Sequence, residues 1–574
     1  MRLNPLQRYQ VWLNHPTMTT ADRLILERYS PSEIDDAFFK DIEFGTAGMR
    51  GIMGPGPNRI NPYTIQKATI AYGLMLIDHY PDQLQRGVII AHDNRHGAIP
   101  FTELVSNILN AMGIDTFTFK ELVPTPLLSY AVRHLRALGG IMLTASHNPK
   151  QYNGVKVYDE EGCQLVPQKI QPMLNHLAIL PDALSLSVPS SIRKGKHQVV
   201  QDDVEQTYLN KVKSLQRLPA LEKKDFRIIF SPQHGASYRI LPQLFQELGY
   251  QLSLVTSQAN PDPDFLGTLS PNPEEKLAYQ EAIQLGQKDK AHLIMVADPD
   301  ADRVGLAYLD AKGNYVLLNG NESAALLIHY LLTQRKHNHD LPIYGVVYDT
   351  IVSSPLARKI AHSFGVKTET FLTGFKFIGD RIAFYEKHAG PQFIFGYEES
   401  YGCLIGDFVR DKDAIQALLL YAEMALYHFQ QGKNLGQALH EIFNEFGYHL
   451  DRQFSLTLSG IEGADFLDQL MNQLRLTPFK PLSGHKVILV EDFQTQIKKD
   501  VDGHQSNIAL PMSNVIKFSF SDGSTIVVRP SGTEPKCKFY FSITDQSMEE
   551  CETKLASYMD AFSKIYLSKD KPLK

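Results

Sequence analysis

The central part of the chain alternates between short apolar runs and amphipathic segments. In its first stretch, apolar or β-rich runs at 86–95, 115–119 and 139–146 predict strands, and periodic segments at 101–113 and 127–138 predict helices. Strands that alternate with helices usually form a parallel sheet that is buried on both faces. The pattern therefore predicts an α/β fold built on a largely parallel sheet.

The same alternation starts twice more along the chain. The second copy comprises 226–235, 240–249, 250–257, 274–286 and 291–302, and the third comprises 342–354, 354–365, 366–374, 378–388 and 391–400. Each copy opens with a hydrophobic strand that runs into a polar loop, and closes on a strand that runs into its most polar loop. We interpret this as a threefold internal repeat of about 110–130 residues, with chance similarity among α/β units as the alternative.

The two ends of the chain differ from the repeats. Residues 7–13, 19–29 and 30–39 are predicted to form helices. Near the other end, residues 515–544 are typical of antiparallel strands around an Asp-Gly turn, and residues 547–568 predict a closing helix. The last part is therefore an α+β domain and not a fourth copy.

A chain of 574 residues is too long for one hydrophobic core. The changes of pattern place boundaries near Asp203, Leu318 and Gly447, and a polar stretch at 181–203 is expected to be a surface loop or the approach to the first linker. We predict four domains, at 1–203, 204–318, 319–447 and 448–574.

Composition excludes several classes of partner. The net charge of −6 gives no overall attraction to nucleic acid or to an anionic membrane, so an anionic ligand needs a local basic pocket. The polar, proline-broken start resembles no signal peptide, and no run reaches the roughly 18 apolar residues of a membrane span. Four scattered cysteines without a CxxC pair fit a reducing compartment. We expect a cytoplasmic protein without nucleic-acid or membrane partners.

The segment LTASHNPKQYNGVKVY, residues 143–158, contains the first candidate chemistry. Small residues, the rigid Pro149 and a polar cluster follow a hydrophobic strand, as in loops that hold one side chain still. Ser146 is the candidate nucleophile. Serines at strand ends more often satisfy backbone groups or cap a helix, so this segment does not decide the role alone.

An acidic loop closes the second copy. Asp298, Asp300 and Asp302 stand at alternate positions, so their carboxylates can converge on one hard cation such as Mg²⁺. A calcium EF-hand is excluded because Arg303 and Leu309 occupy the positions that require glycine and glutamate. A solvated acidic turn is the alternative.

Three further loops carry polar groups suited to ligands. Residues 396–400, GYEES, offer carboxylates and a hydroxyl for sugar hydroxyls, although glutamates in loops are usually only solvated. Residues 529–536, RPSGTEPK, form a candidate phosphate cradle without P-loop spacing, and an ordinary hairpin is the alternative. Residues 43–51 combine glycines with Arg50, which could reach an anion.

Together these loops favour phosphoryl transfer. A nucleophile, a cation site, a sugar-type loop and a phosphate cradle are the parts that this chemistry needs. In open parallel sheets, ligands bind beyond the carboxyl ends of the strands, where all three closing loops lie. The sequence has no nucleotide fingerprint, which favours phosphate moving between the enzyme and a sugar.

The motifs also resemble a known family. TASHNPK with NGVK, DPDADR, GYEES and RPSGTEPK, in this order, resemble the four signature loops of the α-D-phosphohexomutases, and the resemblance covers roughly residues 40–560. FGTAGMRG, HDNRHG and GYEESYGCLIGDFVRDKDA are most similar to the branch that contains bacterial α-phosphoglucomutases, phosphopentomutases and sugar-bisphosphate synthases.

This resemblance implies a fold and a set of roles. The fold would be three related mixed-sheet α/β domains plus a C-terminal α+β domain around a central cleft. Ser146 would be carried as phosphoserine, Arg50 and Lys156 would lie near the reacting oxygen, and Lys156 or His147 would assist proton transfer. Mg²⁺ would bind Asp298, Asp300, Asp302 and a phosphoserine oxygen. The implied substrate-binding residues are Arg303, Thr373, Gly374, Lys376, Glu398, Ser400, Arg529, Ser531, Gly532 and Thr533.

Two further details concern the loops of this chain. Residues 373–376 resemble the loop that helps the family distinguish two substrate orientations. Pro299 stands where many relatives have glycine, which we expect only to stiffen the loop.

The activity implied is conversion of glucose 1-phosphate to glucose 6-phosphate, with glucose 1,6-bisphosphate as intermediate and activator, and with the last domain swinging to close the cleft. The partner would be a phosphorylated sugar, and the protein a monomer or dimer. Alternatives with the same mechanism are phosphopentomutase, acting on ribose or deoxyribose 1-phosphate, and phosphomannomutase. A bisphosphate synthase that uses an acyl-phosphate donor and a non-catalytic phosphosugar-binding protein are further alternatives.

Overall fold

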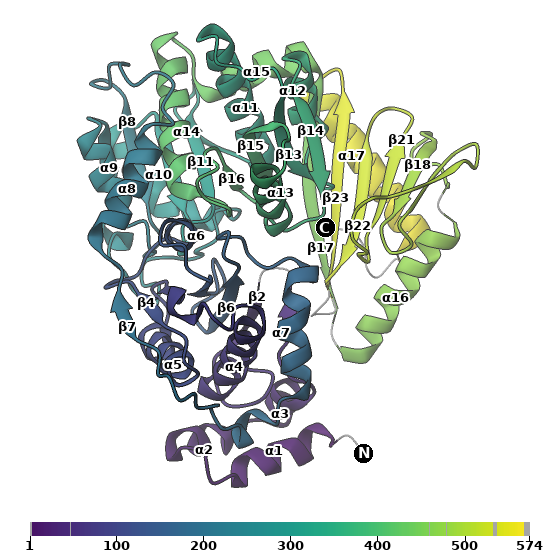
Figure 1. Cartoon of the computed structure of the whole chain (residues 1–574). Coiled ribbons are helices and arrows are strands. Elements are labelled where there is room, and N and C mark those ends of the chain that lie inside the picture. The colour runs from purple at the N-terminus through teal and green to yellow at the C-terminus, as the bar shows by residue number, and fades with distance from the viewer. Residues whose placement is uncertain (1–2, 46–47, 459, 478, 532–535, 568–574) are drawn as a thin grey trace. The chain divides into compact units, whose positions relative to one another are not determined.

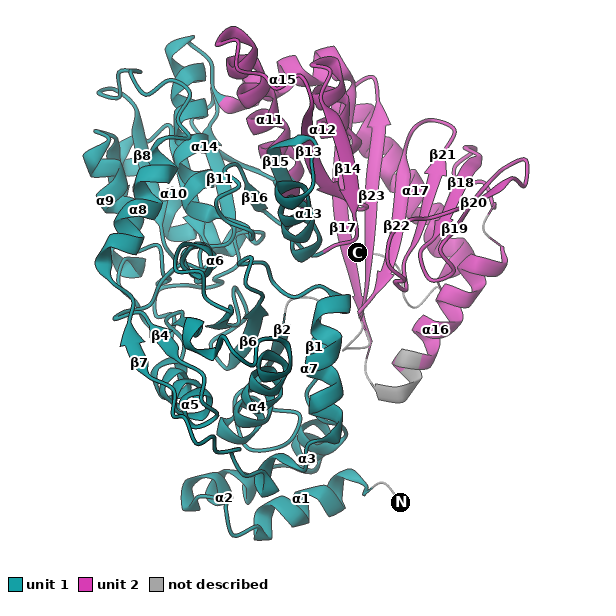
Figure 2. Ribbon diagram, viewed as in Figure 1, with its two compact units in different colours: residues 1–320, 374–396, 400–434 teal, residues 321–373, 397–399, 435–574 magenta. Residues whose placement is uncertain are grey.

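A computed structural model describes residues 3–45, 48–458, 460–477, 479–531 and 536–567. The chain forms two compact units (Figure 2). One unit comprises 1–320, 374–396 and 400–434, and the other comprises 321–373, 397–399 and 435–574. No helix among these described residues is both long enough and apolar enough to cross a membrane.

Three short helices form the start of the chain, as predicted. They are α1 (Pro5–Asn14), α2 (Thr20–Leu26) and α3 (Pro31–Phe38). Asn4, Thr19 and Ser30 cap them by accepting backbone N–H groups with their side chains, which is the usual way that orphan donors at a helix start are satisfied. Trp12 packs edge-on against Phe38, with ring centroids 5.9 Å apart, and holds the helices together.

The first sheet is mixed. Its strands are β1 (Phe44–Gly45), β2 (Gly48–Ile52), β3 (Val88–His92), β4 (Thr116–Thr118), β5 (Gly139–Leu143), β6 (Tyr152–Tyr158) and β7 (His197–Val199), in the order β1-β2-β6-β5-β3-β4-β7. The strands β5, β3, β4 and β7 are parallel, whereas β6, β2 and β1 extend the sheet with antiparallel pairs. The prediction of a largely parallel sheet therefore holds for one side only, because β5 and β6 form a hairpin around the loop of Ser146.

Helices connect these strands and cover them. They are α4 (Pro62–His79), η1 (Leu84–Arg86), α5 (Ala98–Ala111), α6 (Thr125–His134), α7 (Pro167–Ile179) and η2 (Ala183–Ser185). The polar stretch at 181–203 is more ordered than a surface loop, because β7 within it pairs with β4. Its three residues are exposed, so no apolar pattern marks the strand.

The second and third copies contain the strands β8 (Arg227–Ser231), β9 (Gln251–Leu254), β10 (Leu293–Ala297), β11 (Val304–Leu309) and β12 (Tyr315–Leu318), then β13 (Gly345–Thr350), β14 (Lys367–Phe371), β15 (Gln392–Glu398) and β16 (Gly402–Leu404). Equivalent strands follow the same order in all three sheets: β4-β3-β5-β6, β9-β8-β10-β11 and β14-β13-β15-β16. This shared topology supports the internal repeat. It also places the three signature loops at equivalent positions, each after the third strand of its copy.

The helices of these copies are α8 (Asp202–Lys213), α9 (Ile240–Glu247), η3 (Thr256–Gln258), η4 (Lys276–Tyr279), α10 (Gln280–Asp289), α11 (Gly320–His337), α12 (Pro355–Ser363), α13 (Lys376–Lys387), α14 (Ala414–Gln430) and α15 (Leu435–Phe446). The helix predicted at 274–286 is in fact a 3₁₀ turn, η4, followed directly by α10.

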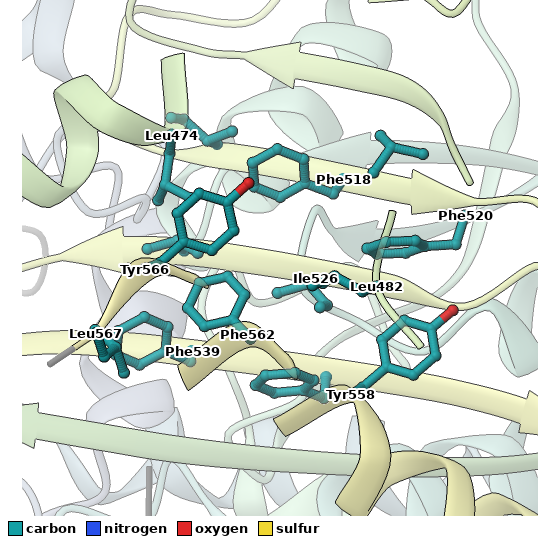
Figure 3. Packing of buried hydrophobic residues seen from close by; sticks show 14 of the residues in the cluster. Leu474, Leu482, Phe518, Phe520, Ile526, Phe539, Tyr558, Phe562, Tyr566 and Leu567 are labelled. Carbon is teal, nitrogen blue, oxygen red and sulfur yellow. The ribbon is translucent and has the colours of Figure 1, made fainter. Parts of the chain in front are cut away.

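The C-terminal part is an antiparallel sheet with two helices; the antiparallel strands and the closing helix are as predicted, whereas the helix at 460–476 was not predicted. Its elements are β17 (Tyr448–Thr457), α16 (Gly460–Leu476), β18 (Val487–Asp492), β19 (Ile497–Asp500), β20 (Gln505–Asn507), β21 (Ile516–Phe520), β22 (Thr525–Pro530), β23 (Lys536–Asp545) and α17 (Met548–Tyr566). The strand order is β17-β23-β22-β21-β18-β19-β20. Figure 3 shows its core, in which Phe562 of α17 packs on Phe539 of β23 with ring centroids 5.6 Å apart.

A buried histidine in this unit predicts acid sensitivity. His449 of β17 is 2 % exposed, and the Lys359 ammonium of α12 lies 3.0 Å from its Nε2. Burial, and then the charge of Lys359, lower the pKa of His449 from 6.5 to about 3. Below about pH 6.5 the unfolded chain binds a proton that the folded chain does not. The free energy of unfolding therefore falls as the pH falls, by up to about 1.4 kcal/mol per pH unit.

We expect His449→Gln to remove part of this dependence. Between about pH 7 and about pH 5, the variant should lose about 2 kcal/mol less of its free energy of unfolding than the parent protein, measured by urea denaturation at both pH values. The exposed His504, replaced by glutamine, is the control. Equal losses in the His449 variant and the parent would show that His449 does not cause the acid sensitivity.

Candidate active site

The loop between β5 and β6 presents Ser146. Its hydroxyl donates a hydrogen bond to Oδ2 of Asp298 at 2.6 Å, and Nδ1 of His147 lies 3.2 Å from the hydroxyl oxygen of Ser146. Ser146 is only 1 % exposed and has a φ of 51°, in the left-handed region that costs a non-glycine residue free energy. The fold therefore brings the candidate nucleophile to the acidic loop, 152 residues further along the chain.

The loop between β10 and β11 gathers the three predicted carboxylates. One oxygen from each of Asp298, Asp300 and Asp302 lies within 4.8 Å of the others, and all three residues are buried. Asp298 Oδ1 accepts backbone N–H groups from Asp302 and Arg303, at 3.0 and 2.9 Å. This is no solvated acidic turn, because its carboxylates are removed from water.

The triad fits a hard divalent cation. Oδ1 of Asp300 and Oδ1 of Asp302 are buried and accept no hydrogen bond from any residue that the structure describes. Buried carboxylate oxygens are normally satisfied, so two such oxygens in one cluster favour a missing ligand. Three converging carboxylates are the hard oxygen donors that Mg²⁺ prefers.

Two lysines offset the charge of the triad. Lys156 of β6 donates to Oδ2 of Asp300 at 2.7 Å and to Oδ2 of Asp302 at 2.9 Å. Burial alone would lower the pKa of Lys156, but the two carboxylates outweigh it and the pKa is raised. Burial, and then the neighbouring acids, raise the pKa of Asp298 well above its ordinary value. Lys412 Nζ lies 3.3 Å from Oδ2 of Asp302, so it belongs to the same cluster.

Lys412 and Thr125 are site residues that the sequence did not reveal. Lys412 lies in RDKDA, a segment noted only for its family resemblance. Thr125 opens α6, and its hydroxyl and backbone N–H both donate to Asp300, at 3.1 and 2.9 Å. No sequence signal near Thr125 points to this contact, which depends on how two repeats pack.

Arg50 and Arg303 also lie beside this cluster. Arg50 stands on β2 opposite Gly154 of β6, and its charge opposes protonation of Lys156. Its buried Nε has no hydrogen-bond partner among the described residues, which leaves a donor for an anion. Arg303 instead donates to Oε1 of Glu274 at 2.6 Å. Arg50 therefore lies near Lys156, while the predicted place of both residues beside the reacting oxygen and substrate binding by Arg303 stay predictions.

The other predicted substrate-binding residues are divided between the units. Gly374, Lys376 and Ser400 belong to the first unit, and Thr373, Glu398, Arg529 and Ser531 belong to the second. Gly532 and Thr533 lie outside the described residues. Lys376 opens α13, where burial lowers its pKa, and Glu398 ends β15 and is 7 % exposed. The binding of one ligand by this set stays a prediction.

The chain matches four domains described together for one family. They are phosphoglucomutase/phosphomannomutase α/β/α domain I at residues 41–178, domain II at 206–311, domain III at 319–446 and the C-terminal domain at 486–556. The chain belongs to the phosphoglucomutase/phosphomannomutase family. The predicted membership of the α-D-phosphohexomutases, and of their bacterial phosphoglucomutase branch, is thereby confirmed.

Individual relatives agree with this assignment. A phosphoglucomutase of Staphylococcus epidermidis is 38% identical over 509 residues, which cover 88% of this chain and 91% of that protein. A phosphoglucomutase of Staphylococcus aureus is 37% identical over 537 residues, covering 92% and 94%. As a member of this phosphoglucomutase/phosphomannomutase family, the protein is a metal-dependent mutase that acts on a phosphorylated sugar.

Solved structures show the same fold. A putative phosphomannomutase from Thermus thermophilus superposes with a TM-score of 0.67 at 22% identity, covering 92% of this chain and 99% of that one. The pp63/parafusin phosphoglucomutase from Paramecium gives a TM-score of 0.69 at 18% identity, covering 93% and 97%. The predicted class, three related α/β domains plus a C-terminal domain, is confirmed.

Proposed function

We propose that the protein interconverts glucose 1-phosphate and glucose 6-phosphate through a phosphoserine at residue 146. The observation that carries this proposal is the 2.6 Å contact between Ser146 Oγ and Asp298 Oδ2, which supports Ser146 as a nucleophile beside the candidate cation site. Relatives at 36–38% identity are named phosphoglucomutase, which supports glucose over the pentose and mannose alternatives.

In this proposal Asp298, Asp300 and Asp302, with an oxygen of the phosphoryl group on Ser146, would hold Mg²⁺, which would neutralise charge there. Arg50 and Lys156 add positive charge around the phosphoryl group that is being transferred. The phosphoryl group passes from Ser146 to the 6-hydroxyl of glucose 1-phosphate, and the proton of that hydroxyl passes, with Lys156 or His147 assisting, to the serine oxygen that loses the phosphoryl group. Glucose 1,6-bisphosphate results.

The second half of the cycle regenerates the enzyme. The bisphosphate presents its other phosphate to Ser146, the serine oxygen accepts that phosphoryl group, and glucose 6-phosphate leaves. We propose that Glu398 and Ser400 hold sugar hydroxyls, and that Arg529, Ser531, Gly532 and Thr533 hold the phosphate that is not reacting. Thr373, Gly374 and Lys376 would help to distinguish the two orientations of the bisphosphate, and Arg303 would also bind the substrate.

We further propose that this enzyme works in the cytoplasm, as a monomer or dimer. All four cysteines are free and buried, which supports a reducing compartment.

A comparison of substrates tests the proposed activity. In a coupled mutase assay, kcat/KM for glucose 1-phosphate should exceed the values for mannose 1-phosphate and ribose 1-phosphate by about 10-fold or more. Addition of a trace of glucose 1,6-bisphosphate should increase the rate, because it phosphorylates Ser146. A higher kcat/KM for ribose 1-phosphate would instead make the protein a phosphopentomutase. Rapid bisphosphate synthesis from 1,3-bisphosphoglycerate with weak mutase turnover would make it a bisphosphate synthase.

A further inference from the structure

We propose that, in each of the three repeats, the loop after the first strand holds the signature loop after the third strand in its working conformation. The three holding loops are residues 93–97, 232–239 and 351–354, with Thr350 at the end of β13 included in the last. Arg95, Gly235 and Thr350 would thus be positioning residues for the nucleophile, the metal ligands and the sugar loop. This inference rests on the proposed function and extends it.

The topology provides the reason. The first and third strands of a repeat are neighbours in its sheet, as β3 and β5, β8 and β10, and β13 and β15 show. The first two of these pairs are parallel in register, so their carboxyl ends lie at the same edge. The loop that leaves the first strand therefore emerges beside the loop that leaves the third.

In the first repeat, Arg95 binds the backbone of the nucleophile loop. Its side chain is wholly buried and donates to four carbonyl oxygens: those of Ser146 at 2.6 Å, of Pro149 and Tyr152 at 2.9 Å each, and of Asn148. Buried carbonyls of an irregular loop need donors, and one guanidinium here serves four.

Asp93 completes this first holding loop. Its Oδ2 accepts the Thr144 hydroxyl at 2.6 Å and lies 3.3 Å from Nε of Arg95. The Thr144 oxygen in turn accepts the backbone N–H of Ser146 at 2.8 Å. These contacts fix the backbone on both sides of Ser146, and strained φ values persist only where surrounding contacts determine them.

In the second repeat, the contact is between backbones. Ala236 N–H donates to the carbonyl of Pro299 at 2.7 Å, and a Cβ on Gly235 would lie 2.3 Å from Cα of Pro299. Pro299 stands between Asp298 and Asp300. Only glycine at position 235 therefore allows the holding loop to approach the metal-ligand loop this closely.

In the third repeat, side-chain hydroxyls make the contact. The Thr350 hydroxyl lies 3.2 Å from Oε2 of Glu399, the neighbour of the predicted sugar ligand Glu398. Ser353 Oγ lies 3.1 Å from the Thr350 hydroxyl and accepts the Thr350 backbone N–H at 3.2 Å. This holding loop therefore orients the GYEES loop through Glu399.

The three loops serve different parts of the reaction, so their variants should change different constants. Arg95→Lys should lower kcat and the rate of Ser146 phosphorylation by about 100-fold, because a misplaced nucleophile loses the geometry of attack. Gly235→Ala should weaken Mg²⁺ binding by about 10- to 100-fold. Thr350→Val should raise KM for glucose 1-phosphate by about 10-fold, with kcat within a few-fold of the parent.

Each variant has a matched control. Arg86→Lys alters another arginine that donates to loop carbonyls, those of Arg136 and Ala137. Gly286→Ala adds a Cβ that would meet the Tyr315 ring at 2.8 Å, away from the acidic loop. Thr350→Ser keeps the hydroxyl and should restore KM.

The experiment uses the full-length enzyme. It measures kcat and KM, Ser146 phosphorylation by glucose 1,6-bisphosphate with intact-protein mass spectrometry, and Mg²⁺ affinity from the Mg²⁺-dependent rise in melting temperature. The proposal is supported if each variant changes its own constant and its control does not. If Gly235→Ala is insoluble, the Arg95 and Thr350 variants carry the test.

Two other results are distinguishable. If each variant lowers the melting temperature and changes every constant to a similar extent, the holding loops are only structural and the inference is wrong. If the parent enzyme fails to convert glucose 1-phosphate, the proposed function is wrong instead, while the phosphorylation and Mg²⁺ measurements still report on the loops.

Discussion

Replacement of Ser146 by alanine is expected to lower kcat by at least about 10⁴-fold and to leave the protein folded. Ser146 is the only hydroxyl seen to bond Asp298 in the described structure, so no neighbour is placed to take over the phosphoryl group. Without this hydroxyl the enzyme cannot form the phosphoserine, so the two-step transfer of the phosphoryl group through the enzyme is lost. Coupled mutase assays and thermal melting of the purified variant measure both effects.

Ser106→Ala is the matched control. Ser106 is also buried in the first repeat, and its hydroxyl bonds Thr116 at 2.7 Å, away from the acidic loop. It should keep its turnover and lose little more than one hydrogen bond of stability, about 1 kcal/mol. Mutase turnover in Ser146→Ala within about 10-fold of the parent would refute the role of Ser146.

Replacement of Asp300 by asparagine is expected to weaken Mg²⁺ binding by about 100-fold or more and to lower kcat by about 10³-fold. The change removes one of three charges around the cation site and places an amide where a buried Oδ1 lacks a partner. Chelation of the parent enzyme with EDTA should abolish turnover, and Mg²⁺ should restore it. The affinity is measured without substrate, from the Mg²⁺-dependent rise in melting temperature.

A second acidic cluster supplies the control. Ligand atoms of Asp500, Asp502 and His504 also lie within 4.8 Å of one another, but this cluster is largely exposed. Asp500→Asn should change neither the Mg²⁺ response nor kcat. If Asp300→Asn responds to Mg²⁺ as the parent does, the cation binds somewhere other than the triad.

The sequence was most informative where strands are buried on both faces. Continuous apolar runs such as LIMVA predicted β10, and equivalent runs predicted β3, β5, β8, β13 and β15. The hairpin strands β6, β11 and β16 were not predicted. They follow the signature loops directly, and β6 carries Lys156 within the strand, so motif and strand overlap in the sequence. The short exposed β7 has no apolar pattern at all.

The candidate site was predictable where chemistry is concentrated in one segment. Ser146 and the three aspartates stand in compact motifs, and the structure brings them together. Lys412 and Thr125 could not be placed, because their roles depend on contacts between segments more than a hundred residues apart. Arg95 stands in the HDNRHG loop, which was noted in the sequence only for its family resemblance. In the structure its guanidinium donates a hydrogen bond to the Ser146 carbonyl.

The most direct test of the phosphoserine relay is peptide mass spectrometry on the enzyme itself. After incubation with glucose 1,6-bisphosphate and Mg²⁺, the peptide that contains Ser146 should carry one phosphoryl group. If that group carries an oxygen-isotope label, addition of glucose 1-phosphate should move the label into glucose 6-phosphate, while Ser146 regains an unlabelled phosphoryl group from the bisphosphate. Mutase turnover by enzyme whose Ser146 stays unmodified throughout, or whose phosphoryl group is found on another residue, would contradict the account.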